Sequence, residues 1–271
     1  MKTLNFKFTT TVEFSEEIEQ HDFILRCLPK SGAWQTVRAR LEIDPAEPFD
    51  VQTDSLGNDM AVGYIEAPHA HFTYKIEGTA TVDATRPDTS EPHPIYLRET
   101  PRTAMTPEMR DFLADAASAG MREMVTSGMG AASSATFTVE HLMHTVADAM
   151  EYKPGSTTVN TTAREAFEQR AGVCQDFAHI LIALIRACNI PARYVSGLTV
   201  GEGATHAWVE AYLDGCWRGL DPTRDRLVDE TYIVLAHGRD WADCPIERGT
   251  FQGFAQQTQS VFASVADVTA E

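Results

Sequence analysis

The sequence lacks any apolar run that approaches the roughly 20 residues of a membrane span. Its first residues, Met1 to Thr9, carry charges and an alternating pattern, but they lack the apolar core of about 7–15 residues that a signal peptide needs. These two absences predict a protein without a membrane-spanning segment or a secretion signal. We therefore expect a cytoplasmic location.

Clusters of basic residues are also missing. Lys and Arg total 22 against 39 Asp and Glu, which gives a formal net charge of −17 and a pI near 4.9. Such a surface repels nucleic acids and anionic membranes, so we expect neither as a partner. The acidic surface is interpreted first as a device for solubility, and attraction of basic peptide substrates is the alternative.

Cysteine pairs at metal-binding or redox spacing are absent too. The five cysteines are odd in number and widely spaced, with no Cys-x-x-Cys motif, which favours a reducing compartment over a disulfide framework or a zinc site. His69 and His71 stand two residues apart, but no third ligand is evident, so exposed strand histidines are the preferred interpretation. The sequence predicts no metal and no organic cofactor.

What the sequence does contain predicts two domains. Residues 1–98 alternate polar and apolar positions between turn signals such as Asp54–Asn58, which is typical of a small antiparallel β domain, a sandwich. A polar segment with five prolines, residues 86–107, follows as a linker. Residues 99–271 form the second domain, with helices expected from Pro107 and Val139 and a loop between them at 128–134.

The central feature of the second domain is Cys174, which follows Gly172 and begins a strongly apolar helical pattern. A helix N-terminus offers free N–H groups and a positive dipole end, which stabilise a thiolate over a thiol. Cys174 is therefore a candidate nucleophile, and a small core hydrophobe is the alternative. His179 lies about 140° round the helix from Cys174, so we interpret it as structural, paired with Asp176. One buried stripe is expected, formed by Phe177, Ile180, Leu181, Leu184, Ile185 and Cys188.

A hairpin further along supplies partners for that cysteine. Asp214–Gly215 is a strong two-residue turn signal, and it predicts that Leu213 pairs with Cys216 and so on down the two strands. In this register His206 and Asp221 are diagonal neighbours on one face, roughly 7–8 Å apart, within reach of an imidazole and a carboxylate. A nucleophilic cysteine needs a base, and the base needs an orienting group.

Five motifs in order carry a resemblance to a known family. The segments that begin at Gly172, Ile190, His206, Trp217 and Gly238 together resemble the bacterial transglutaminase-like family of cysteine proteases, in the transglutaminase-like superfamily. The similarity covers about residues 152–253, and the β segment before it resembles the N-terminal β domain of the family. The link between Gly201 and Thr205 is shorter than in many members, which leaves the substrate contacts there open.

The resemblance implies an α+β, papain-like (transglutaminase-like) cysteine-proteinase core, preceded by the antiparallel β-sandwich domain. It implies that Cys174 is the nucleophile, His206 the general base and later acid, and Asp221 the orienting carboxylate. The backbone N–H of Cys174 and the side chain of Tyr152 are candidate oxyanion donors, with a packed aromatic as the alternative for Tyr152. Cys188, Cys216 and Cys244 are expected to be inert.

The expected reaction is attack by Cys174 on a peptide or protein amide to form a thioester. Hydrolysis by water is the leading hypothesis. Transfer of the acyl group to an amine, as in a transglutaminase, is the second, and a catalytically idle binding module is the third. The sequence does not determine the acyl acceptor or the oligomeric state.

Overall fold

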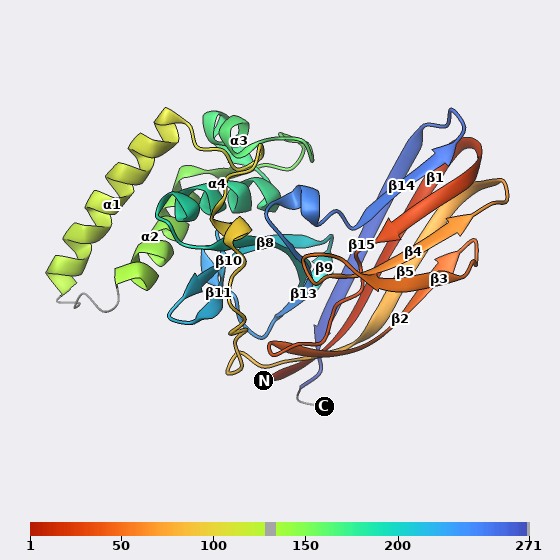
Figure 1. The fold of residues 1–271 in the computed structure, drawn as a ribbon, viewed down its shortest axis with the longest axis horizontal. Coiled ribbons are helices and arrows are strands. Elements are labelled where there is room, and N and C mark those ends of the chain that lie inside the picture. The colour runs from red at the N-terminus through yellow and green to blue at the C-terminus, as the bar shows by residue number, and fades with distance from the viewer. Residues whose placement is uncertain (128–133, 270–271) are drawn as a thin grey trace.

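The computed structural model describes residues 1–127 and 134–269. An eight-stranded antiparallel sheet lies at one end of the molecule, and a five-stranded antiparallel sheet with helices α1–α4 lies at the other (Figure 1). A short parallel pair, β6 (Glu151–Tyr152) and β7 (Ala171–Gly172), leads into the central helix of the second half. Within the described residues, no helix combines the length and the apolar character that crossing a membrane requires.

The eight-stranded sheet is organised around one long strand, β1 (Lys2–Leu25). Its first half pairs with β5 (His69–Val82) and β15 (Gln257–Asp267), and its second half pairs with β4 (Asp59–Ile65) and β14 (Glu247–Gln252). The register shifts between the two halves, so β1 links two groups of strands over one core. Alternate side chains face that core, as a strand with one buried face requires: Leu4, Phe6, Phe8, Val12 and Phe14.

The division of the chain differs from the expected domains at 1–98 and 99–271. Strands β14 and β15 come from the last 25 residues, yet they lie beside β1, with β15 paired from Leu4↔Asp267 to Phe14↔Gln257. The alternating pattern of a strand shows which face is buried but not which strand lies next to it, so sequence alone assigned these strands to the second domain. The remaining strands of the sheet are β2 (Gln35–Asp44), β3 (Phe49–Thr53) and β9 (Gly201–Gly203).

The five-stranded sheet carries the hairpin that the sequence predicts. Leu213 pairs with Cys216 and Tyr212 with Trp217, so the predicted register is confirmed. Asp214 and Gly215 both have positive φ, 52° and 82°, as a type I′ turn demands. The strand order is β12 (Arg226–Leu227), β11 (Cys216–Asp221), β10 (His206–Leu213), β8 (Ala192–Thr199) and β13 (Tyr232–Gly238).

Helix α4 (Cys174–Ala187) is the core of the second half, between the five-stranded sheet and the other helices. Every residue from Gln175 to Arg186 is buried, so the expected single stripe is wrong: the helix is covered on all sides. Its cover consists of α1 (Pro107–Ser127), α2 (Ser134–Ala149) and α3 (Ala163–Gln169). The loop expected at 128–134 lies, except for its last residue, outside the described residues.

Arg186 connects the C-terminal end of α4 to three other segments. Its guanidinium donates to the carbonyl oxygens of Tyr96, Arg98, Ala192 and Arg239 and to the hydroxyl of Thr103, at 2.7–3.2 Å. The side chain is buried, which lowers its pKa to about 10, against the opposing effect of Asp240 and Tyr96. The segment before α1 is therefore fastened to the helix rather than laid loosely over it.

Replacing Arg186 with leucine is expected to reduce the free energy of unfolding by about 3–5 kcal/mol. The substitution leaves several buried carbonyl groups without a donor, which costs more than the lost contacts alone. Urea denaturation followed by circular dichroism measures this loss. Arg218→Leu is the control, because Arg218 is half exposed and makes one 3.5 Å ion pair with Asp214. Equal small losses in both variants would contradict the role of Arg186.

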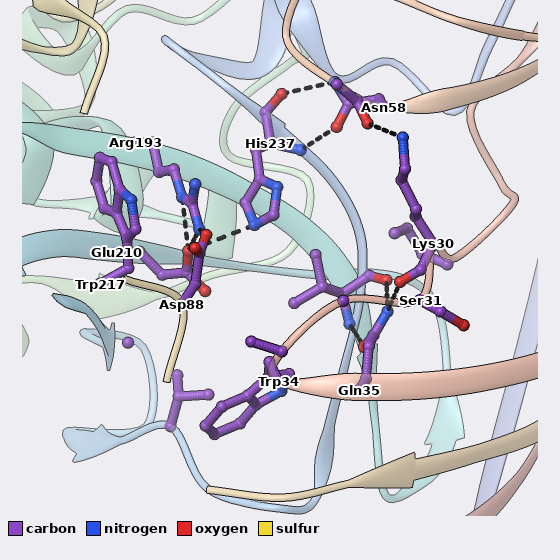
Figure 2. A pocket seen from close by; sticks show the side chains of 17 residues that line it. Lys30, Ser31, Trp34, Gln35, Asn58, Asp88, Arg193, Glu210, Trp217 and His237 are labelled. Carbon is purple, nitrogen blue, oxygen red and sulfur yellow. Dashed lines mark hydrogen bonds and ion pairs between the residues drawn. The ribbon is translucent and has the colours of Figure 1, made fainter. Parts of the chain in front are cut away.

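Side-chain amides join the two halves at the edge strand β13 (Figure 2). Gln35 donates to the carbonyl of Val234 (2.8 Å) and accepts the Val234 N–H (2.9 Å). Asn58 makes the same two bonds with His237, at 2.8 and 2.7 Å. Each amide therefore satisfies an edge residue as a neighbouring strand would. Three side chains of β8 and β13 also enter the apolar core of the larger sheet: Leu198, Ile233 and Leu235. The two halves therefore share one core.

Candidate active site

Cys174 is the first residue of α4, as the sequence predicts. The strand pair β6–β7, with Tyr152 beside Gly172, leads the chain to this position. Gly172 is required by close approach rather than by a left-handed turn, because a Cβ there would lie 2.6 Å from the side chain of Asp176. The close packing of the chain at Gly172 therefore leads directly into the first turn of α4, where Cys174 lies.

Asp176 holds this turn in place. Its carboxylate accepts the backbone N–H of Val173 (2.8 Å) and the hydroxyl of Thr157 (2.7 Å). The expected pair between Asp176 and His179 does not form. Instead Nε2 of His179 accepts the backbone N–H of Trp241 at 3.1 Å, because the ring faces η3 (Trp241–Asp243). Complete burial lowers the pKa of His179 to about 3, so it is neutral and acts as an acceptor.

The hairpin brings the imidazole of His206 to the carboxylate of Asp221. Nε2 of His206 lies 2.7 Å from Oδ2 of Asp221. This is the contact that the register argument predicts from diagonal neighbours. The second ring nitrogen, Nδ1, is left free of Asp221, and Cys174 lines the same cavity as His206.

Asp221 is fully buried but well supplied with donors. Oδ1 accepts the backbone N–H groups of Thr223 (3.1 Å) and Arg224 (3.3 Å), and Oδ2 accepts the hydroxyl of Tyr232 (2.9 Å). The guanidinium of Arg224 lies 4.0 Å from the same carboxylate. Burial alone would raise the pKa of Asp221, but His206 and Tyr232 lower it below its ordinary value, so the group is a carboxylate.

The charge on His206 follows from these partners. Burial opposes an imidazolium, but hydrogen bonds with Asp221 and Cys174, and the charges of both, raise the pKa of His206 to about 9. A ring that can donate a proton therefore lines the same cavity as the Cys174 side chain. The arrangement can therefore supply a nucleophile, a proton donor and an orienting carboxylate in one line.

Tyr232 and Arg224 are contacts of Asp221 that sequence reasoning missed. The sequence gives weak evidence for the Arg224 contact, because Arg224 follows Asp221 by three residues in a turn. Tyr232 had none, since it reaches Asp221 from β13, a strand on the far side of β10 and β8. Only the order of strands in the sheet brings its hydroxyl there.

The Tyr232→Phe variant is expected to lose activity at the acid end of its pH profile and little near pH 8. Removal of one donor weakens support of the Asp221 carboxylate and raises its pKa, so the acid limb of the pH profile moves to higher pH. The pH dependence of kcat measures this shift. Tyr74→Phe, in the core of the larger sheet, is the control. A Tyr232→Phe profile that superimposes on that of the native protein would contradict the role.

A cavity of about 190 Å³ opens beside Cys174 and His206. Tyr152 lines it as well; this side chain is 54% exposed, with its ring 6.5 Å from that of Phe177. Tyr152 is thus adjacent to the sulfur, and its role as an oxyanion donor stays a prediction. Trp208, by contrast, is fully buried in a cluster with Val195, Tyr232 and Val234 and does not line the cavity.

The short link before His206 forms the opposite wall of this cavity. Residues Gly201–Gly203 form β9, which pairs with Ala263–Val265 of β15. The larger sheet therefore extends to the candidate site, and Ala263 lines the cavity together with Glu202 and Arg224. The contacts that the sequence left open thus involve both halves of the molecule.

The other cysteines and the strand histidines lie elsewhere. All five cysteines are free thiols. Burial raises the pKa of Cys188, and that of Cys244 more strongly, and Cys216 donates to the carbonyl of Leu213 at 3.6 Å. His69 is not an exposed strand residue: it is buried, with Nε2 3.1 Å from Nδ1 of His21, because aromatic rings of the sheet core enclose the pair. No group of three potential metal ligands occurs among the described residues.

Comparison with known proteins gives a family for both halves of the chain. Residues 4–81 match the bacterial transglutaminase-like N-terminal region, and residues 122–222 match the transglutaminase-like superfamily. An uncharacterized protein of Mycobacterium tuberculosis (strain ATCC 25618 / H37Rv) is 34% identical over 246 residues, which cover 79% of this chain and 76% of that protein.

Two further similarities concern the fold and one named enzyme. The crystal structure of a candidate cysteine protease from Cytophaga hutchinsonii covers 100% of this chain and 93% of its own, with a TM-score of 0.64 and 23% identity. The protein-glutamine gamma-glutamyltransferase of Pseudomonas aeruginosa is 29% identical over 119 residues, 37% of this chain and 18% of that enzyme. The expected α+β fold with an N-terminal β domain is confirmed, and the chain belongs to the bacterial transglutaminase-like family of the transglutaminase-like superfamily.

Proposed function

We propose that this protein is a cysteine-dependent amide hydrolase that cleaves a peptide or protein amide through a thioester on Cys174. The observation that carries the proposal is that Cys174 and His206 line one cavity, while the His206 ring hydrogen-bonds with the buried carboxylate of Asp221 at 2.7 Å. Membership of the transglutaminase-like superfamily supports it, since the same line of residues follows from the motif order.

In the first half of the reaction the Cys174 thiolate attacks the amide carbonyl carbon. The carbonyl oxygen becomes an oxyanion, and the proposed donors to that charge are the backbone N–H of Cys174 at the start of α4 and the hydroxyl of Tyr152, which lines the same cavity. His206 then gives its proton to the leaving amine as the C–N bond breaks. Asp221 holds the ring in the orientation that serves both partners.

In the second half a water molecule attacks the thioester. His206, now neutral, takes a proton from the water, and the Cys174 thiolate leaves as the acid product is released. No step needs a metal or an organic cofactor. The substrate is the partner in this proposal; with a net charge of −17 we expect no nucleic-acid or membrane partner, and we propose the cytoplasm as the compartment.

Transfer to an amine is the second candidate function. It is favoured by the similarity to the glutamyltransferase of P. aeruginosa, although the matched segment is 18% of that enzyme. Chemically the two reactions share the thioester and differ only in whether water or a primary amine resolves it. A catalytically idle binding module is the third alternative.

One experiment separates the three. The protein is incubated with a panel of amide substrates and a labelled primary amine, while ammonia release, amine incorporation and peptide cleavage are followed. Hydrolysis predicts cleavage or ammonia release without label, and acyl transfer predicts labelled product. If the native protein and the Cys174→Ala variant give the same ammonia release, amine incorporation and cleavage with every substrate, both enzymatic proposals are wrong. The catalytically idle binding module is then the remaining candidate.

A further inference from the structure

A second cavity, of about 220 Å³, lies between the two halves of the molecule (Figure 2). It shares no lining residue with the cavity beside Cys174. Its mouth is formed by exposed residues of the loop 30–33 and by Gly57, whereas its floor consists of buried side chains, among them Gln35, Arg193 and Leu235. Cavities at domain interfaces that combine an open mouth with a buried floor are common ligand sites.

One wall of this cavity carries a buried charge cluster. Arg193 donates from Nε to Glu210 (2.7 Å) and from a terminal nitrogen to Asp88 (2.9 Å), and its guanidinium stacks 4.1 Å from the ring of Trp217. His237 lies 3.4 Å from the same Glu210 carboxylate. The side chains of Arg193 and Glu210 are only 9% and 13% exposed. Figure 2 shows the four groups converging on one side of the cavity.

Two carboxylates, Glu210 and Asp88, share the one guanidinium of Arg193. Burial would raise the pKa of Glu210, but Arg193 above all lowers it to about 2, so Glu210 is ionised. Burial lowers the pKa of His237, so its ring is neutral near pH 7 and the cluster holds one more negative charge than positive.

Lys30, at the mouth, pairs with Asp59 at 3.1 Å and donates to the Gly57 carbonyl, so it does not neutralise the wall. Asp88 is 33% exposed and also accepts the Ser90 N–H at 2.9 Å, so it forms the more open part of the cluster. Carboxylates in excess of their cations at such a partly buried site are stabilised when a further positive group approaches them.

Apolar side chains also line the cavity, among them Trp34, Val228 and Val234. The indole N–H of Trp34 is directed to the Tyr232 carbonyl at 3.5 Å rather than into the space. A ligand with an apolar body is accommodated there. An anionic head would face two carboxylates, whereas a cationic head would complete their charge. The charged and the apolar side chains together select an amphipathic cation.

We propose that the inter-domain cavity binds a small organic monocation, whose ammonium group lies against Glu210 and Asp88 and whose apolar body lies beside Trp34 and Val228. The site is distinct from the catalytic line. Glu210 and His206 face the same side of β10, but Trp208 stands between them, and four residues of strand separate them by roughly 13 Å. The inference does not depend on the proposed reaction.

Three probes of similar shape and different charge test this site: phenethylamine, 2-phenylethanol and 3-phenylpropanoate. Each is titrated by calorimetry into the full-length protein. We expect one saturable site for phenethylamine, at least about tenfold weaker binding of the alcohol and none of the carboxylate. Equal binding of the amine and the alcohol, or no binding of the amine, would overturn the proposal.

Variants then locate the site. Glu210→Gln removes the charge that the ammonium faces, and Gly32→Leu fills the mouth, where a Cβ at Gly32 has no heavy atom within 4 Å. Both are expected to weaken phenethylamine binding about tenfold or more. Glu247→Gln, a carboxyl outside the cavity, is expected to bind normally. If Glu210→Gln fails to fold, Gly32→Leu alone decides, and normal binding by it would overturn the assignment.

Discussion

Replacement of Cys174 with alanine is expected to abolish amide turnover, with kcat lowered by at least about 10⁴-fold. The sulfur is the only atom in the line that can form the thioester, so what remains is the effect of binding and oxyanion donors alone. Steady-state kinetics on the substrate identified by the panel measures the loss. The fold should be unaffected, because a smaller apolar side chain at a half-buried position leaves the helix start intact.

Cys188→Ala is the matched control for this variant. Cys188 ends the same helix and is also half-buried, but it lies outside the cavity that Cys174 and His206 line. We expect its kcat to stay within about twofold of the native value. Substantial turnover by the Cys174→Ala protein, or an equal loss in both variants, would remove Cys174 from the role of nucleophile.

The Asp221→Asn variant is expected to lose about 10³–10⁴-fold in kcat and to change the pH profile. The carboxylate fixes the His206 ring and favours the imidazolium, and an amide does neither. His206 has to be protonated to give a proton to the leaving amine, so native activity should fall as the pH rises through about 9. Without the carboxylate that raises this pKa, residual activity should fall at a lower pH.

A control in the same hairpin separates orientation from folding. Asp214→Asn changes an exposed turn residue with positive φ, which asparagine also adopts, and it should leave both kcat and the pH profile unchanged. Thermal unfolding of Asp221→Asn shows how much of its effect is stability. An alkaline limb that stays near pH 9 in this variant would mean that Asp221 does not set the charge of His206.

Sequence reasoning reached the parts of the site that depend on local rules. The start of the helix at Cys174 followed from a glycine and an apolar period. The pairing of His206 with Asp221 followed from a two-residue turn, because such a turn fixes the register of both strands. These features involve residues close in sequence or linked by one turn.

The features that escaped prediction depend on contacts between distant segments. Strand β15 lies beside β1 although more than 240 residues separate Leu4 from its partner Asp267, and no local pattern records that choice. The hydroxyl of Tyr232 reaches Asp221 only because β13 is the edge of the five-stranded sheet. His69 was interpreted as exposed, but the aromatic core that surrounds it comes from three separate strands.

The rate at which iodoacetamide alkylates Cys174 at pH 6, compared with Cys188 in the same sample by mass spectrometry, shows whether Cys174 is an activated nucleophile. At this pH His206, with a pKa raised to about 9, is positively charged beside the Cys174 sulfur, whereas burial raises the pKa of the Cys188 thiol. We expect Cys174 of the native protein to react at least about tenfold faster than Cys188, and we expect the His206→Ala variant to show no such difference. If Cys174 in the native protein reacts no faster than Cys188, it is not an activated nucleophile.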